Sequence, residues 1–316
     1  MSISKVAGGR ALAAALTLTA ALAGCGAAST TDGGVAAKGS TTTAGQQTIK
    51  VVASTDVYAN IAQSIGGKAV TVMSFISDPD QDPHSYEASA QNQLAISKAD
   101  VVIENGGGYD DFMDRMVKAS HAKATVLNVV ELSGKKAAAG GELNEHVWYD
   151  FPTVTRLADK VATALTVIDG KDAALFQANA KAFTAKVQGL VSEEASLKAS
   201  YGGGGVAITE PVPLYLLEAV GLHNETPPAF SAAVEEGTDV SALVLKQTLD
   251  LFTLGRVKAL VYNEQTSGPI TEQVKKAAEK AGIPVVPVTE TLPQGMSYVA
   301  WMAENLHNVK LALSAR

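Results

Sequence analysis

From Ile49 onward, short runs of apolar and β-branched residues alternate with longer stretches in which apolar residues recur every three or four positions. The short runs are typical of buried strands and the longer stretches of amphipathic helices. The predicted strands are 49–53, 70–76, 100–104 and 125–130, followed by 206–209, 259–262 and 285–288. Strands that alternate with helices predict an α/β fold with mainly parallel sheets, covered by helices on both faces.

One helical stretch in the middle of the chain is longer than a small domain needs. It runs from Asp172 to Ala199 without proline and ends before the glycine run 202–205. At about 1.5 Å per residue it would span about 42 Å. We therefore expect two α/β lobes joined by one long rigid linker helix, although a long packing helix is the alternative. The expected segments are 1–24 (signal peptide), 25–48 (acylated tether), 49–170 (first lobe), 171–200 (linker helix) and 201–316 (second lobe).

The amino terminus has the pattern of a bacterial signal peptide. Two basic residues precede an uncharged Ala- and Leu-rich stretch, 11–23, which is too short to span a bilayer. This stretch ends in Leu22-Ala23-Gly24-Cys25, which resembles a lipobox, and the resemblance implies cleavage before Cys25 and its acylation. An ordinary secretory signal is the alternative. Residues 26–47 are mostly Ala, Gly, Ser and Thr, which predicts a flexible tether on the outer side of the cell membrane.

Composition and charge narrow the functional classes. The chain carries 25 Lys and Arg against 32 Asp and Glu, a net charge of -7. Nucleic-acid binding is therefore not expected, because it requires a cationic face. A single cysteine excludes an internal disulfide and multi-cysteine metal sites. Five histidines remain as candidate nitrogen ligands.

Four residues of metal-ligating types follow predicted strands. His84 lies in an acidic, proline-containing loop, and His146 lies shortly before a helix that Asp150 is expected to cap. Glu210 directly follows the strand run 206–209, and Glu290 follows the strand run 285–288 after one intervening residue. Open α/β sheets bind ligands beyond the carboxyl ends of their strands, so an interlobe cleft would gather all four residues. Each residue alone also has a purely structural explanation, such as a glutamate that opens a helix.

The chain resembles a known family in several segments. Asp82-Pro83-His84-Ser85-Tyr86-Glu87 and Asn144-Glu145-His146-Val147-Trp148-Tyr149-Asp150, with the lipobox and the long helix, resemble the cluster A-I solute-binding proteins. These are the metal-capturing lipoproteins of zinc and manganese ABC importers. The segments 261–266 and 288–293 are also similar.

The resemblance implies one metal site in the interlobe cleft, with His84, His146, Glu210 and Glu290 as its ligands. The family usually has Asp at the fourth position, so Glu290 is a departure. The expected ion is divalent manganese or zinc, with iron also possible. A loop without histidine over 133–143 favours manganese, whereas the Irving–Williams order favours zinc.

The resulting expectation is a monomeric, lipid-anchored, extracytoplasmic binding protein that delivers the ion to an ABC permease. It would not be an enzyme. The alternatives are a secreted zinc metallohydrolase, which would need an open coordination position and a general base, and a surface adhesin with an incidental metal site. No HExxH or GxSxG motif is present. Glu235, Glu236 and Asp239 are expected to form an acidic loop that is solvated or contacts the permease.

Overall fold

The computed structural model describes residues 48–78, 86–137 and 142–315, all within one compact unit. Cys25, the predicted signal peptide and His84 therefore lie outside the described residues. Among the described helices, none combines the length and apolar composition needed to cross a membrane.

The first half of the described chain forms a four-stranded sheet in which every neighbouring pair is parallel. Its strand order is β2-β1-β3-β4. The strands are β1 (Ile49–Thr55), β2 (Val70–Ile76), β3 (Val101–Glu104) and β4 (Thr125–Asn128). The helices are α1 (Asp56–Gly66), α2 (Ala90–Ser97), α3 (Asp111–Ser120), α4 (Val129–Ser133) and α5 (Phe151–Ile168), with 3-10 turns at Gly67–Ala69, Val147–Tyr149 and Gly170–Asp172.

The second half repeats this arrangement with a second parallel sheet, in the order β6-β5-β7-β8. Its strands are β5 (Gly205–Ile208), β6 (His223–Asn224), β7 (Leu260–Asn263) and β8 (Val285–Val288). Its helices are α7 (Leu214–Ala219), α8 (Pro228–Glu235), α9 (Ala242–Thr253), α10 (Pro269–Lys280) and α11 (Tyr298–Ser314).

The central strands of the two sheets, β1, β3, β5 and β7, are largely buried on both faces, and alternate residues of a strand enter different cores. In β1, Val51 and Ala53 pack with α1 and α5, whereas Val52 packs with residues of α2 and α3. In β7, Val261 packs toward α11, whereas Leu260 and Tyr262 pack with α8, α9 and α10. Because successive side chains of a strand face two different apolar cores, these strands appear in the sequence as nearly continuous apolar runs.

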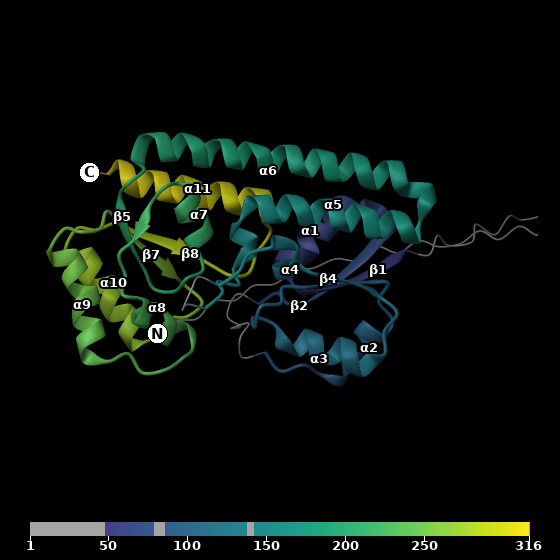
Figure 1. Ribbon diagram of the computed structural model, residues 1–316, viewed down its shortest axis with the longest axis horizontal. Helices are drawn as coiled ribbons and strands as arrows, with labels where there is room; N and C mark the ends of the chain where they lie inside the picture. Colours follow the sequence, from purple (N-terminus) through teal and green to yellow (C-terminus); the bar gives the residue numbers. More distant parts are fainter. Residues whose placement is uncertain (1–47, 79–85, 138–141, 316) are drawn as a thin grey trace, which may run out of the picture. The chain divides into compact units, whose positions relative to one another are not determined.

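A long helix, α6 (Ala173–Tyr201), lies against both halves of the described chain (Figure 1). Its buried side chains belong to the same core as residues of both sheets. Asn179 donates to the backbone oxygen of Ile65 at the end of α1 (2.8 Å), and Phe183 packs against Tyr298 of α11. The α/β class, the two lobes with parallel sheets and the long helix are thus confirmed. The exact domain boundaries stay a prediction, since one core runs through both lobes.

One predicted strand extends too far. Residues 125–130 are all predicted as strand, but Val129 and Val130 begin α4. Asn128 causes the change because its side chain accepts a hydrogen bond from the backbone N–H of Glu131 (2.9 Å) and caps the helix. The short strand β6 was not predicted, because two exposed polar residues carry no apolar pattern.

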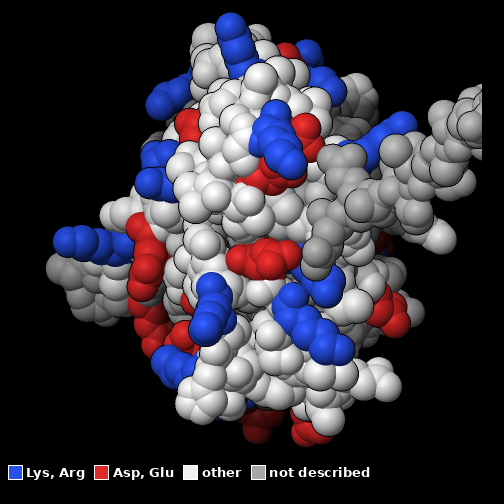
Figure 2. All heavy atoms as spheres, turned by 90° about the vertical axis from the view of Figure 1, so that its right-hand side faces the viewer, with Lys and Arg blue, Asp and Glu red and all other residues white. Residues whose placement is uncertain are grey.

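Charged side chains of both signs are interspersed on the face that Figure 2 presents. Among the described residues drawn there, Lys and Arg do not merge into one continuous basic surface.

Candidate metal site

His146 is fully buried in the loop that leads into α5. Its Nδ1 lies 2.8 Å from Oδ1 of Asn144, whose amide nitrogen donates to the backbone oxygen of Pro211 (3.0 Å). Because an amide oxygen only accepts, Nδ1 donates in this contact, and in the neutral imidazole Nε2 then presents its lone pair. A neutral imidazole oriented in this way by a hydrogen bond to its other nitrogen is typical of a metal ligand.

The loop that carries His146 is held by both lobes. Asn105, at the end of β3, donates its side-chain amide to the backbone oxygen of Glu145 (3.0 Å). From the second lobe, Tyr215 donates to the backbone oxygen of Asn144 (2.6 Å). The rings of Tyr109 and Trp148 pack beside the imidazole, at 5.9 and 5.1 Å between ring centres. The loop that carries His146 is therefore fixed by packing and by hydrogen bonds from both sides.

Glu210 and Glu290 are brought together by the order of the second sheet. Glu210 follows β5 and Glu290 follows β8, and β7 lies between these strands. Asn263, the last residue of β7, donates its side-chain nitrogen to Oε2 of Glu210 (2.6 Å) and to Oε1 of Glu290 (2.8 Å). Both glutamates are almost fully buried, at 3% and 2% exposure. One amide group thus holds two buried carboxylates at the carboxyl ends of parallel strands.

Neighbouring side chains fix the backbone around these carboxylates. Gln265 accepts hydrogen bonds from the backbone N–H groups of Glu290 and Thr291 through the same side-chain oxygen. Thr209 accepts from the backbone N–H of Asn263 (2.9 Å). Asn263 and Gln265 were not predicted as site residues from the sequence, because only histidine and acidic side chains were considered as metal ligands. Their position at the carboxyl end of β7 is the sequence feature that marks them.

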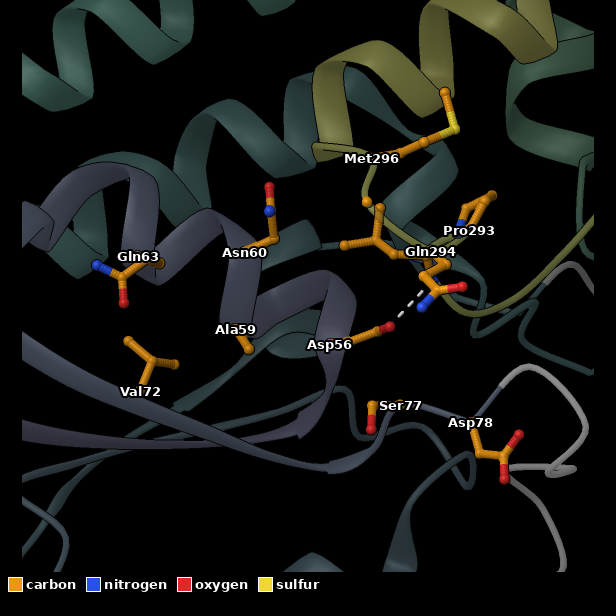
Figure 3. A pocket seen from close by; sticks show the side chains of 12 residues that line it. Asp56, Ala59, Asn60, Gln63, Val72, Ser77, Asp78, Pro293, Gln294 and Met296 are labelled. Atoms are coloured by element: carbon orange, nitrogen blue, oxygen red, sulfur yellow. Dashed lines mark hydrogen bonds between the residues drawn. The ribbon is translucent and has the colours of Figure 1, made fainter. Parts of the chain in front are cut away.

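Helix α1 of the first lobe holds the segment that follows Glu290. Asp56 accepts from the backbone N–H of Leu292 (3.1 Å), and Asn60 accepts from that of Tyr298 (2.9 Å). Figure 3 shows Asp56 directed toward this segment, at a pocket that is also lined by Ser77 and Asp78. Burial raises the pKa of Asp56 to about 6, although the bond from Leu292 opposes this shift. The segment that follows Glu290 in the second lobe is therefore anchored on the first lobe.

Three predicted ligands lie close to one another. The imidazole Nε2 of His146 lies 3.9 Å from Oε2 of Glu290, and Asn263 links Glu290 to Glu210. The fourth, His84, lies outside the described residues and stays a prediction. Binding of a metal by these residues also stays a prediction at this point.

Glu235 extends this group beyond what the sequence predicted. Its Oε1 lies 3.8 Å from Nε2 of His146, and its side chain is 17% exposed, whereas Glu236 and Asp239 are exposed. Glu235 is the last residue of α8 and largely shielded, so the expected solvated loop is wrong for this residue, whereas the expected contact of the segment with a permease stays a prediction. Ligand atoms of Glu145, His146 and Glu235 all lie within 4.8 Å of one another.

The electrostatics of this region disfavour so many carboxylates without a cation. Burial and, to a smaller extent, the negative charges of Glu145, Glu210 and Glu290 together raise the pKa of Glu235 to about 9. Burial also raises the pKa of Glu145 to about 7. Buried like charges are costly unless a counter-charge offsets them. Imidazole nitrogen with carboxylate oxygens is a donor set that suits divalent manganese, iron and zinc.

The fold and this site together define a two-lobed α/β protein bridged by a long helix, with a buried imidazole and carboxylates gathered at strand ends. The sequence profile of a family described as "Zinc-uptake complex component A periplasmic" matches residues 51–312. The chain belongs to this family.

Curated relatives carry names that refer to manganese or to metal transport. The "Manganese-binding lipoprotein MntA" of Bacillus subtilis is 30% identical over 181 residues, which cover 56% of this chain and about half (55%) of that relative. The "Metal ABC transporter substrate-binding lipoprotein SloC" of Streptococcus mutans is 26% identical over 289 residues, which cover 84% of this chain and 90% of SloC.

Solved structures share the fold at low sequence identity. The structure titled "Crystal structure of ZnuA" matches with a TM-score of 0.69 at 20% identity, over 84% of this chain and 98% of that one. The periplasmic zinc-binding protein TroA from Treponema pallidum matches with a TM-score of 0.71 at 18% identity, over 84% of this chain and 99% of TroA. At such identities, these matches establish the architecture alone.

Proposed function

We propose that this protein captures a divalent transition metal ion outside the cytoplasmic membrane and delivers it to the permease of an ABC importer. The observation that carries the proposal is the buried group of His146, Glu210 and Glu290, in which Asn263 bridges the two carboxylates. The ion is the transported cargo, and no chemical turnover is involved. Membership in the zinc-uptake family supports this assignment.

The charge of the group suits a divalent ion. Glu210 and Glu290 together supply two negative charges, which cancel the charge of the ion, while the His146 imidazole binds as a neutral ligand. We propose His84 as the second imidazole ligand. Each of these two carboxylates supplies a charged ligand that partly offsets the charge of the ion, so each should be required for tight binding.

We infer that the ion is manganese or zinc. Carboxylate oxygens suit manganese and imidazoles suit zinc, so an equal mixture of the two ligand types accommodates either. Relatives that are named for manganese and for iron support a site that accepts more than one first-row metal.

The location follows from the amino-terminal segment. We propose that Cys25 carries the lipid anchor and that the binding lobes work at the outer face of the membrane as a monomer. Several relatives are named lipoproteins of ABC transporters, which supports this placement. Two or more acyl chains give stable anchoring, whereas a single chain gives only marginal binding.

The test is the metal content and affinity of the purified full-length protein. After loading with an excess of manganese or zinc and extensive dialysis, we expect close to one ion per chain by elemental analysis. Competitive titration of the metal-free protein with both ions then ranks them. A protein that retains no stoichiometric metal under either condition would contradict the proposed function.

A further inference from the structure

We propose that Glu235 is a further ligand of the transported metal, which places three carboxylates of the second lobe on the ion. This inference rests on the proposed function and deepens it, because the additional carboxylate would determine which metal the site prefers. It concerns a residue that the sequence pattern assigned to the solvated surface.

Distances from the buried imidazole carry the proposal. Nε2 of His146 lies 3.8 Å from Oε1 of Glu235 and 3.9 Å from Oε2 of Glu290. Ligand atoms that bind one ion at about 2.0–2.2 Å lie roughly 3–4 Å apart. Both carboxylates therefore stand at the separation from the imidazole that a shared ion requires. Glu235 meets this condition as well as Glu290, which the family resemblance selects.

The position of Glu235 is set by the packing of α8. Phe230 and Val234 of this helix are buried in the core beneath β7, and Glu235 follows Val234 as the last helical residue. This anchoring directs the Glu235 side chain toward His146, while the next residue, Glu236, is exposed. The carboxylate is therefore held beside the site by the core and not by a flexible surface loop.

The surroundings of Glu235 give no structural explanation for a negative charge. It lies at the carboxyl end of a helix, where the helix dipole disfavours an acid. Across the described residues, the ion pairs of Lys and Arg involve other acids, and the one basic group within 4 Å of Glu235 is the His146 imidazole. A divalent ion at Nε2 of His146 would offset this unfavourable placement.

A third carboxylate would change the metal preference of the site. Manganese favours oxygen ligands and tolerates a high coordination number, whereas zinc favours four ligands in a tetrahedron and binds imidazole well. With Glu235 bound, the site would contain more oxygen ligands than a tetrahedral zinc ion requires. Loss of this carboxylate should therefore weaken manganese binding more than zinc binding.

The experiment measures manganese and zinc affinities of full-length protein by competitive titration. It compares wild type with Glu235→Gln and with the matched control Glu236→Gln, which changes an exposed neighbour by the same atoms. Changing a group that only holds a ligand in place lowers metal affinity by about 10–100-fold. Losing a ligand itself should therefore lower the affinity for manganese by at least about tenfold. The zinc affinity should fall less, and the control should match wild type for both metals.

The possible outcomes separate the role of Glu235 from the proposed function. Weaker manganese binding with a higher zinc-to-manganese preference in Glu235→Gln supports the proposal. Wild-type affinities for both metals in a folded Glu235→Gln variant overturn it but leave the proposed function intact. Glu235→Ala provides a second variant that cannot hydrogen-bond to the site, and a wild-type metal preference in it also overturns the proposal. Wild-type protein without stoichiometric metal contradicts the proposed function itself.

Discussion

Asn263 offers a direct test of how the site is built, because its side chain donates to both proposed carboxylate ligands. Asn263→Ala would remove the amide that lies 2.6 Å from Glu210 and 2.8 Å from Glu290. It would leave two acidic groups buried beside a small cavity, since Asn263 is itself only 1% exposed. We expect the metal-free protein to lose stability and the site to lose its orientation.

The size of the effect follows from the two hydrogen bonds. A hydrogen bond to a charged group contributes about 1.5–3 kcal/mol, and two of them would give about 3–6 kcal/mol if they were independent. They share one amide group, so their contributions are not additive. We therefore expect a loss of about 3 kcal/mol in the free energy of unfolding of the metal-free protein.

The assay is urea unfolding of full-length protein in the presence of a chelator, with Asn308→Ala as the control. Asn308 lies on α11 and is only partly buried, so its replacement should change stability by less than about 0.5 kcal/mol. Metal affinity of the Asn263→Ala variant should also fall by about 10–100-fold, as for other groups that orient ligands. An unfolding free energy equal to that of the control, with unchanged metal affinity, would show that Asn263 does not hold the two carboxylates in place.

Three further predictions concern the imidazole, a buried acid and a strained turn. His146→Ala should reduce metal content after dialysis to background, with an unchanged circular dichroism spectrum, and retained metal would defeat the assignment. Burial and the charge of Asp150 raise the pKa of Glu194 from 4.5 to about 8. The folded state therefore binds the carboxyl proton of Glu194 more tightly than the unfolded state does. The stability that this proton contributes is lost as the pH rises from about 4.5 through 8. Glu194→Gln should remove up to about 1.4 kcal/mol per pH unit of this dependence in unfolding experiments between pH 5 and 9, and parallel profiles would contradict it. Gly106→Ala should destabilise the protein more than Gly108→Ala. Both glycines have positive φ angles, 76° and 104°. However, a Cβ at Gly106 would lie 2.3 Å from the side-chain nitrogen of Asn128, whereas a Cβ at Gly108 would face open space. Equal unfolding midpoints for these two variants would argue against the clash.

The sequence predicts the fold well because the central strands of both sheets are largely buried on both faces. Strands such as β1 and β7 then read as short apolar runs between helical patterns, which the chain shows clearly. The pattern fails where a local hydrogen bond decides. Val129 and Val130 look like the end of a strand, but capping by Asn128 turns the chain into α4.

The candidate site is predictable only in part, for a physical reason. Glu210 and Glu290 each come within two residues of the end of an apolar strand run. Their place at the carboxyl ends of the strands can therefore be inferred from the sequence alone. Glu235 stands beside Glu236 and a glycine, which is typical of a solvated turn. Its burial depends on how α8 packs against the sheet, and such long-range packing leaves no local signal.

The proposed metal site can be tested by X-ray diffraction from crystals of the metal-loaded protein, with anomalous data collected at the absorption edge of the bound manganese or zinc. We expect one strong anomalous peak per chain, about 2.0–2.3 Å from Nε2 of His146 and from carboxylate oxygens of Glu210 and Glu290. A peak elsewhere in the molecule, or a site that contains no metal after loading, would contradict the proposed site.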